Sequence, residues 1–333
     1  MTKIATLGNA LTDVLTRIDS EKTLSALGLP KGSMTLISAE RFAEFSKLME
    51  DPSTEIATGG SAANTALCVA HLSNLYPQKP VEVDFVGKMS FSDRFGQNFA
   101  ATFRQAGVKL HAIEATDMAS GVCTAFVLPD GERTMATFLG AAARMEADEL
   151  TPEMFAGADI VHIEGYLVQN HDLILRAIQL AHASGALVSL DMASYNIVAA
   201  EHQFFAEQLL PQTDIVFANE EEAAAWLPGT PEESLASLAT LCRVAVVKVG
   251  AHGAWAQSGA ERVFCPAEKI ENVVDTTAAG DFFAAGFLHA YSVGKGLGDS
   301  LHSGSVCASH VIQVMGTALP QEAWDDVQAK LKD

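Results

Sequence analysis

The chain is 333 residues long, half of it apolar and a fifth of it charged, which is typical of a soluble globular protein with a sizeable core. Its formal charge of −20 argues against a nucleic-acid partner, because binding a phosphate backbone requires clustered Lys and Arg. Every apolar run falls short of the ~18 residues that cross a bilayer, and the N-terminal MTKIATLGNALTDV lacks the apolar core of a signal peptide, so we expect neither a membrane partner nor secretion.

The first third of the chain alternates strand-like and helical patterns. Two apolar runs have the length of strands, and three amphipathic stretches have the spacing of helices. Ser61 is expected to cap the second helix, and Gly107 is expected to end the third. The expected strands cover residues 4–8 and 83–87, and the expected helices cover 38–50, 61–75 and 92–106.

The second half repeats this rhythm more clearly. Four apolar runs of strand length are separated by helical patterns. Such alternation predicts βαβ units, and therefore a mostly parallel sheet with helices on both faces. The four expected strands are DIVHIEG (159–165), ALVSLDM (186–192), DIVFAN (214–219) and VAVVKVG (244–250).

One stretch departs from the α/β rhythm. Residues 121–139 form two strand-like runs around Asp130-Gly131, which is a strong hairpin signal. Residues 13–19 and 33–37 are strand-like as well. We therefore expect a single α/β body that carries a small β-sheet lid built from two separate segments. The body would comprise residues 1–12, 38–109 and 140–333, and the lid residues 13–37 and 110–139.

Three glycine-rich segments stand out, and none has the pattern of a Walker A loop or a dinucleotide fingerprint. GGSAAN at 59–64 precedes a helix, where paired glycines let a ligand approach the backbone closely. KVGAHGA at 248–254 follows an apolar strand, at the edge where ligands bind in an open parallel sheet. Each also has a purely structural explanation, as a tight turn with an N-cap and as a β-turn.

The third segment is DTTAAGD at 275–281, directly before an apolar helix. Small residues that lead into a helix leave backbone N–H groups unpaired, and these can bind an anion. Asp281 would then be a base beside a bound phosphate, which is the pairing that phosphoryl transfer needs. The alternative is an acid that is merely favoured by the helix dipole.

Together these segments resemble the ribokinase-like (PfkB) family of carbohydrate and nucleoside kinases, and among them bacterial members similar to adenosine kinase. The resemblance implies an α/β fold with a mostly parallel central sheet, helices on both faces and a small β lid. It also implies ATP-dependent transfer of the γ-phosphate to a hydroxymethyl group. The matching segments, in order, are TGGSAANTA (58–66), FVGKMSFSDRFG (85–96), NEEE (219–222), KVGAHG (248–253) and DTTAAGDFFAAGFL (275–288).

The resemblance assigns roles to residues at three places. Asp281 would deprotonate the substrate, while the backbone of Ala278, Ala279, Gly280 and Asp281 would form an anion hole. Asp13 would bind two sugar hydroxyls. The remaining substrate-binding positions are Asn9, Gly59, Gly60 and Asn64.

The ATP site is implied by two further segments. Asn219 and Glu222 would organise Mg²⁺, with Glu222 acting through water. Lys248, Gly250 and Gly253 match the nucleotide element, with Lys in place of the usual Thr. Asp275 and Thr277 match positions that bind a monovalent cation in many members, so K⁺ is a further expected cofactor beside ATP and Mg²⁺.

Arg133 lies on the expected hairpin of a very acidic chain. It would reach the phosphates when the lid closes, or it would be an exposed strand arginine. Ala278 departs from the family, which usually has Gly there. If its φ is positive, the Cβ atom costs roughly 1–2 kcal/mol, and if its φ is negative, the change is nearly silent.

The substrate remains open between two classes. Asn9 in GNALTD is similar to adenosine kinases, as are LGAAA (139–143) and IEGYLV (163–168). Phe126 and Tyr166 would stack on a base, or else belong to the apolar core. These features favour an adenosine-like nucleoside, with a ribose or fructose kinase as the alternative. A third alternative is a weakly active ligand-binding relative, because of Ala278.

Five scattered cysteines indicate a reducing cytoplasm and argue against a zinc site or a disulfide framework. They are Cys68, Cys123, Cys242, Cys265 and Cys307. The expected partner is the small-molecule substrate, and the expected assembly is a monomer or a homodimer that forms through the lid.

Overall fold

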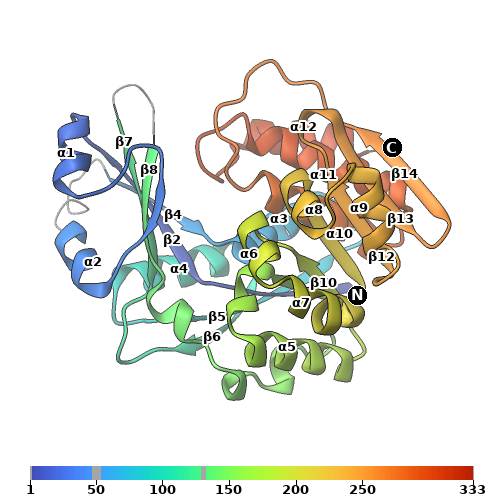
Figure 1. The fold of residues 1–333 in the computed structure, drawn as a ribbon, viewed down its shortest axis with the longest axis horizontal. Coiled ribbons are helices and arrows are strands. Elements are labelled where there is room, and N and C mark those ends of the chain that lie inside the picture. Colours follow the sequence, from blue (N-terminus) through green and yellow to red (C-terminus); the bar gives the residue numbers. More distant parts are fainter. Residues whose placement is uncertain (1, 47–53, 129–132, 333) are drawn as a thin grey trace.

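A computed structural model describes residues 2–46, 54–128 and 133–332 (Figure 1). Its main feature is a nine-stranded sheet in the order β14-β13-β12-β11-β10-β9-β1-β5-β6. The seven strands from β12 to β6 are parallel, and β13 and β14 extend one edge as an antiparallel hairpin. The strands are β1 Thr2–Leu7, β5 Val81–Met89, β6 Lys109–Glu114, β9 Ile160–Glu164, β10 Leu187–Asp191, β11 Ile215–Asn219, β12 Val244–Lys248, β13 Gly253–Ser258 and β14 Glu261–Pro266.

Helices cover both faces of this sheet because its strands are apolar on both sides. Along β11, Ile215 and Phe217 join one buried cluster, whereas Val216 and Ala218 join the other. The first face is covered by α3 Ser61–Leu75, α4 Arg94–Gln105, α10 Ala279–Ser292, α11 Leu297–Val311 and α12 Gln321–Lys330. The second face is covered by α5 His171–Ala183, α6 Tyr195–Ala200, α7 His202–Phe204, α8 Glu220–Trp226 and α9 Pro231–Leu238.

Helix α10 is held in the middle of the first helical layer. It is apolar on nearly all sides, as expected for a helix that packs against neighbours all round. Gly286 lies against the backbone of Ser303 and Gly304 in α11, and a Cβ atom there would overlap that backbone. This close contact sets the position of the helix whose first turn holds Asp281.

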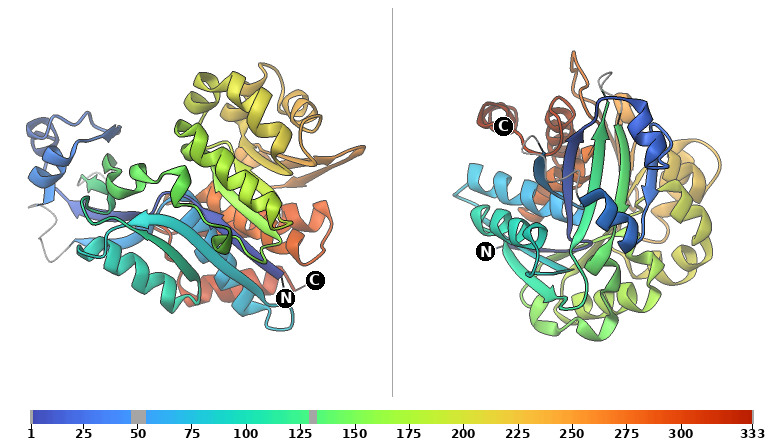
Figure 2. Two further views of the ribbon diagram at one scale, coloured as in Figure 1. Left: turned by 90° about the horizontal axis from the view of Figure 1, so that it is seen from below. Right: turned by 90° about the vertical axis from the view of Figure 1, so that its left-hand side faces the viewer.

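A second, five-stranded sheet has the order β3-β8-β7-β2-β4. Figure 1 shows its helices α1 and α2 on the side away from the large sheet, so its other face is turned toward the body, and Figure 2 shows it from two further sides. Its apolar core includes Val14, Phe45 and Phe126. The elements are β2 Leu11–Arg17, α1 Glu21–Ala26, β3 Met34–Leu36, α2 Ala39–Ser46, β4 Glu55–Gly59, β7 Gly121–Val127 and β8 Arg133–Phe138.

The expected lid boundaries need three corrections. Residues 110–114 lie in β6, which pairs with β5 in the large sheet, because the run continues the parallel ladder. Strand β4 lies in the small sheet, paired with β2, although this segment was expected in the body. Helix α2 also belongs to the lid, since Phe42 stacks on Phe138 with ring centroids 4.7 Å apart.

Several local expectations fall close to what is observed. Strands β7 and β8 pair antiparallel up to Val127 and Arg133, while the expected Asp130-Gly131 turn lies outside the described residues. Gly107 follows α4 with φ 75°, the left-handed conformation that commonly ends a helix. In the described part of the chain, no helix is both long and apolar enough to cross a membrane.

Candidate active site

Four neighbouring parallel strands end in a polar or charged residue at the same edge of the large sheet. Glu164, Asp191, Asn219 and Lys248 are the last residues of β9, β10, β11 and β12. Asp191 is in register with Glu164, and Asn219 is in register with Lys248. In open α/β sheets this edge forms the ligand-binding crevice. The arrangement therefore places the candidate site here.

Asp281 lies in the first turn of α10 and is held by two side chains of α3. Ser61 donates its hydroxyl to Oδ1 at 2.7 Å, and the Asn64 amide donates to Oδ2 at 2.9 Å. Burial raises the pKa of Asp281 to about 6, although these two hydrogen bonds lower it. A fixed carboxylate whose pKa is close to neutral is suited to accept a proton.

The turn before α10 has a strained residue at its centre. Ala278 has φ 60° and ψ 9°, a left-handed conformation that is costly for an alanine. Ala279 donates its N–H to the carbonyl of Thr276 at 3.3 Å, so that group is partly used within the turn. Gly280 and Asp281 have no such bond among the described residues, and their N–H groups remain for an anion.

Paired glycines bring the lid strand β2 against the body. A Cβ atom on Gly59 would overlap the carboxylate of Asp13, and one on Gly60, whose φ is 97°, would overlap the carbonyl of Asn9. Asn64 lies one helical turn after Gly60, in the first turn of α3. The five residues expected to bind substrate therefore lie together, beside Asp281.

Glu164 connects this cluster to the large sheet. Its carboxylate accepts hydrogen bonds from the backbone N–H of Asn9 (2.9 Å), the Asn9 amide and the backbone N–H of Ala62 (3.1 Å). Burial raises the pKa of Glu164 to about 7, and these three donors lower it. Glu164 thus positions the loop that precedes Asp13 and the start of α3.

Several known proteins are similar to this chain in sequence and fold. The family model described as pfkB family carbohydrate kinase matches residues 30–324. The adenosine kinase of Schizophyllum commune is 30% identical over 98% of each chain. The crystal structure of adenosine kinase from Sinorhizobium meliloti superposes with a TM-score of 0.83 at 32% identity, covering 98% of this chain and 99% of that chain. A probable sugar kinase from Rhizobium etli also gives a TM-score of 0.83, at 31% identity, covering 99% of each chain.

The chain belongs to the pfkB family of carbohydrate kinases. It is a kinase that transfers phosphate from ATP to a nucleoside or a sugar. The resemblance noted from the sequence is confirmed, and so is the ribokinase-like α/β fold.

Asn219 and Glu222 form a reciprocal cap at the start of α8 in this kinase. The N–H of Glu222 donates to Oδ1 of Asn219 at 2.9 Å, and the N–H of Asn219 donates to Oε2 of Glu222 at 2.8 Å. Burial, followed by the nearby charge of Asp191, raises the pKa of Glu222 to about 7, while Lys248 lowers it. A bound cation would relieve this repulsion between carboxylates.

The residues around Glu222 fit a metal ion that is bound mainly by water and substrate phosphates. Across residues 2–46, 54–128 and 133–332, no group of three or more His, Cys, Asp or Glu side chains could hold a metal ion. Mg²⁺ keeps much of its water and usually binds through one or two carboxylates and substrate phosphates. The residues present therefore fit Mg²⁺ that arrives with ATP, and Glu222 would hold one of its waters.

Two other expected segments have clear structural roles. Gly250 and Gly253 have φ of 53° and 128°, so both need glycine for the turn between β12 and β13. Asp275 accepts from the N–H and the hydroxyl of Thr277 (3.1 and 2.8 Å) and from the N–H of Gly316 (2.9 Å). These contacts fix the start of the DTTAAGD turn.

Three further residues were expected to contact the phosphates or the base, and the structure gives each a different outcome. Arg133 is the first residue of β8, and its side chain lies outside what the structure describes. Phe126 is fully buried in the lid core, where its ring packs edge-on against Phe45 at 5.7 Å between centroids. The expectation that Phe126 stacks on a base is therefore wrong, because its side chain is on the face of β7 that packs against α2. Tyr166 is 44% exposed, so stacking of its ring on a base stays a prediction.

Motif matching missed Glu164 and Asp191. A weaker signal was present, since each ends or nearly ends one of the apolar runs DIVHIEG and ALVSLDM. Polar residues at the carboxyl ends of parallel strands point into the ligand crevice. Their partners, Asn9 and Lys248, are distant in sequence, so only the fold shows what they contact.

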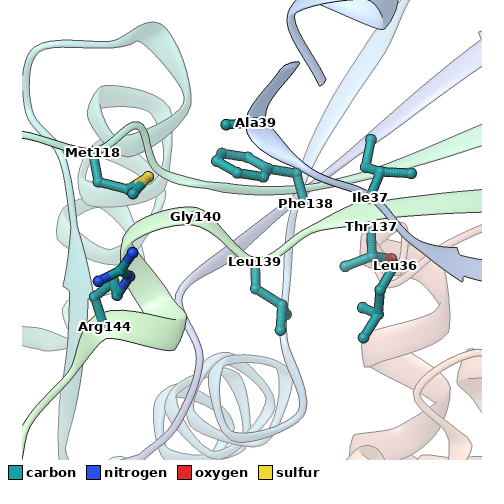
Figure 3. Close-up of a pocket in the computed structure, with 9 residues that line it drawn as sticks. All are labelled: Leu36, Ile37, Ala39, Met118, Thr137, Phe138, Leu139, Gly140 and Arg144. Carbon is teal, nitrogen blue, oxygen red and sulfur yellow. The ribbon is translucent and has the colours of Figure 1, made fainter. Parts of the chain in front are cut away.

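The lid face turned toward the body carries a continuous row of side chains. Asp13 is opposite Cys123, Cys123 is opposite Thr137, and Thr137 is opposite Leu36. Figure 3 shows Leu36, Thr137 and Leu139 on one side of the strands and Phe138 on the other. A cavity of about 280 Å³ opens at this end of the row, where the lid meets the body. It is lined by Leu36, Ile37, Ala39, Met118, Thr137, Phe138, Leu139, Gly140 and Arg144.

Proposed function

We propose that this kinase phosphorylates the 5′-hydroxymethyl group of a nucleoside, with adenosine as the substrate to test first. The observation that carries the proposal is the row from Asp13 to Leu36 across the open face of the lid. Three strand spacings separate these residues, which is about 14 Å. Free ribose bound by Asp13 would leave the apolar half of that row unused, whereas a nucleoside extends along it.

The relatives named adenosine kinase support this proposal, since two of them match this chain at 30% and 32% identity over nearly its whole length. Cys123 and Thr137 offer a surface of small side chains, and Leu36 is 59% exposed and free to cover a flat ring. Apolar and aromatic surfaces with a few polar groups are typical of small-molecule pockets. The base would lie on this surface.

In the proposed reaction, Asp281 removes the proton from the substrate hydroxyl as its oxygen attacks the γ-phosphorus of ATP. The new P–O bond forms while the bond between the γ-phosphorus and the bridging oxygen breaks, so ADP leaves with that electron pair. Ser61 and Asn64 hold the carboxylate still. The N–H groups of Gly280 and Asp281 face the charge that develops on the phosphoryl oxygens.

Asp13 and Asn64 would orient the sugar, and Glu164 would support them through Asn9 and Ala62. When bound, Mg²⁺ would neutralise part of the phosphate charge. Asn219 and Glu222 would hold its water from the side of α8. The contacts of Asp275 and Thr277 support a structural turn, and their binding of a monovalent cation stays a prediction. The proposed cofactors are therefore ATP and Mg²⁺. The homodimer through the lid stays a prediction.

The proposal is tested by ATP turnover with adenosine, other nucleosides, ribose and fructose. We expect adenosine to have the highest kcat/KM and its product to be the 5′-monophosphate. Leu36→Glu should lower kcat/KM for adenosine by at least about tenfold, because it buries a charge against the base. Met34→Glu is the matched control, since Met34 is 57% exposed on the same face of the same strand but two residues further from the Asp13 row.

Faster transfer to a free sugar than to any nucleoside would overturn the nucleoside assignment. Tight binding of adenosine without any phosphoryl transfer would overturn the proposed catalytic role. Equal effects of Leu36→Glu and Met34→Glu on kcat/KM would show that the base does not lie along the row.

A further inference from the structure

A lysine lies beside the anion-binding turn of α10. Lys248 ends β12, and its Nζ atom is 3.0 Å from Oδ2 of Asp191 at the end of β10. A Cβ atom on Gly280 would lie 3.1 Å from the same Nζ, so the ammonium group is close to the backbone of that turn. The side chains of Lys248 and Asp191 are only 14% and 13% exposed.

The position is unusual on electrostatic grounds. A cation next to the first turn of a helix faces the positive end of the helix dipole, so the two repel each other. A buried ammonium also costs free energy unless it is paired. Asp191 supplies one partner, and it is itself anchored because Oδ1 accepts from the N–H of Ala193 at 2.9 Å.

Two positive features that face one another suggest an anion between them. Among the described residues, no backbone carbonyl accepts from the N–H groups of Gly280 and Asp281, and Lys248 approaches the same turn from the end of β12. The ammonium also interacts with the charges of Asp191, Glu222 and Asp281, which hold the pKa of Lys248 above its usual value although burial lowers it. Lys248 is therefore a permanent positive charge at the centre of an acidic site.

We propose that Lys248 binds the γ-phosphoryl group of ATP as it is transferred, and that Asp191 is the positioning residue that holds the ammonium against the turn. This inference rests on the proposed function. In the step, Nζ donates hydrogen bonds to the non-bridging phosphoryl oxygens and keeps its protons throughout. The attacking oxygen still loses its proton to Asp281, and the electron pair of the broken bond still leaves with ADP.

The Lys at this position replaces the Thr of the usual nucleotide element. A threonine hydroxyl offers one neutral donor, whereas an ammonium offers three donors and a full charge. In a chain with net charge −20, a fixed charge of this kind offsets the repulsion between the acidic site and ATP.

The experiment compares nucleotides that contain and lack the γ-phosphate. The main variant is the double substitution Asp191→Asn with Lys248→Met, because replacing both members of a buried pair avoids an unpaired charge. We expect kcat to fall by about 10²–10³-fold, as for loss of one donor to a developing oxyanion. The affinity for the non-hydrolysable ATP analogue AMP-PNP should fall at least about tenfold, since that ligand loses a charged contact, while ADP affinity changes less than about twofold.

Lys88→Met is the matched control. Lys88 has a similarly covered side chain, 13% exposed, and a comparable ion pair with Glu149 at 2.6 Å, but its Nζ also donates to the carbonyl of Arg144 at 2.8 Å instead of approaching the turn of α10. Its removal should leave both nucleotide affinities and kcat within about twofold. A cooperative thermal unfolding transition, measured for each variant, checks that the variant is folded.

Two outcomes would overturn the assignment of Lys248. One is an equal loss of AMP-PNP and ADP affinity in the double variant, and the other is an unchanged kcat. If wild-type protein transfers no phosphate at all, the proposed function fails, and the binding comparison still tests Lys248 separately.

The role of Asp191 is tested by the single variants. Asp191→Asn keeps the shape of the side chain but loosens Lys248, so kcat should fall less than in Lys248→Met. Adding Asp191→Asn to Lys248→Met should cause no further loss, because a positioning residue has no effect without the group that it positions. If the two losses multiply, Asp191 acts independently of Lys248.

Discussion

The amide nitrogen of Asn64 donates a hydrogen bond to the carboxylate of Asp281 at 2.9 Å, across 217 residues of sequence. Ser61, one turn earlier in α3, donates to the other carboxylate oxygen at 2.7 Å. The hydroxyl of Thr65 donates to the backbone carbonyl of Asp281 at 3.2 Å. The start of α3 therefore holds the first turn of α10, and with it the proposed base.

Removing the amide of Asn64 should shift the pH dependence of the reaction. Its hydrogen bond lowers the pKa of Asp281, so Asn64→Ala should raise that pKa above about 6. The acidic loss of activity would then begin at a higher pH than in wild type, and the variant would be weakest relative to wild type below about pH 6. The measurement is kcat/KM between pH 5.5 and 9.

Ser73→Ala provides a control within the same helix. Ser73 accepts a hydrogen bond from the N–H of Val81 at 2.9 Å, so its loss weakens α3 packing without touching Asp281. It should lower stability and leave the pH profile in place. A profile shifted equally by both variants would mean that α3 stability, rather than the hydrogen bond, controls the pKa.

Asp281→Asn should lower kcat by at least about 10²–10⁴-fold, the usual contribution of a general base. The amide has nearly the same shape, so binding of AMP-PNP should be retained. Rapid-quench assays of product and titration of the nucleotide measure the two effects separately. Turnover close to that of wild type would exclude Asp281 as the base.

Wild-type kcat/KM should decrease below about pH 6, as Asp281 becomes protonated. The decrease should approach about tenfold per pH unit once the group is mostly protonated. A profile that is flat between pH 5 and 8 would show that proton transfer to Asp281 does not limit the reaction.

Protonation of Asp281 should raise the stability of the fold, although it lowers activity. The pKa of Asp281 is about 6 in the folded protein, against an ordinary value of 3.8 for an aspartate in the unfolded chain, so the folded protein binds more protons between these values. This contribution to the free energy of unfolding is complete below about pH 4 and is lost as pH rises through about 6, by roughly 2–3 kcal/mol. The difference in unfolding free energy between wild type and Asp281→Asn, measured in urea at pH 4.5 and pH 7, should change by this amount. A pH-independent difference would mean that the folded and unfolded pKa values are equal.

Ala278→Gly should stabilise the protein. A left-handed alanine costs roughly 1–2 kcal/mol, and the extra freedom of glycine in the unfolded chain offsets about half of that, so a net gain of about 0.5–1 kcal/mol is expected. Ala193→Gly is the matched control, because Ala193 has φ 68° and lies outside the turn of α10. Both should raise the free energy of unfolding in urea. Only Ala278→Gly should also raise kcat/KM, and no gain there would show that the alanine does not impair the anion site.

Sequence patterns determined a large part of the fold and of the site. Alternating apolar runs and amphipathic stretches follow from local physics, because a strand or helix must bury its apolar side wherever it lies. The DTTAAGD segment likewise determines a helix start with small residues and an acid in its first turn. For these reasons the α/β body, the lid hairpin and the position of Asp281 in the first turn of a helix were all predictable.

Only the tertiary structure decided how these parts meet. The ladder between β5 and β6, the pairing of β4 with β2 and the stacking of Phe42 on Phe138 moved the lid boundaries, because strand pairing depends on distant partners. The sequence left the sign of the Ala278 φ angle open, and only the folded turn before α10 shows that it is positive. The contacts of Asp281 with α3 and of Lys248 with Asp191 join segments that share no local pattern, so their geometry, and with it the electrostatics of the site, is a property of the packed fold.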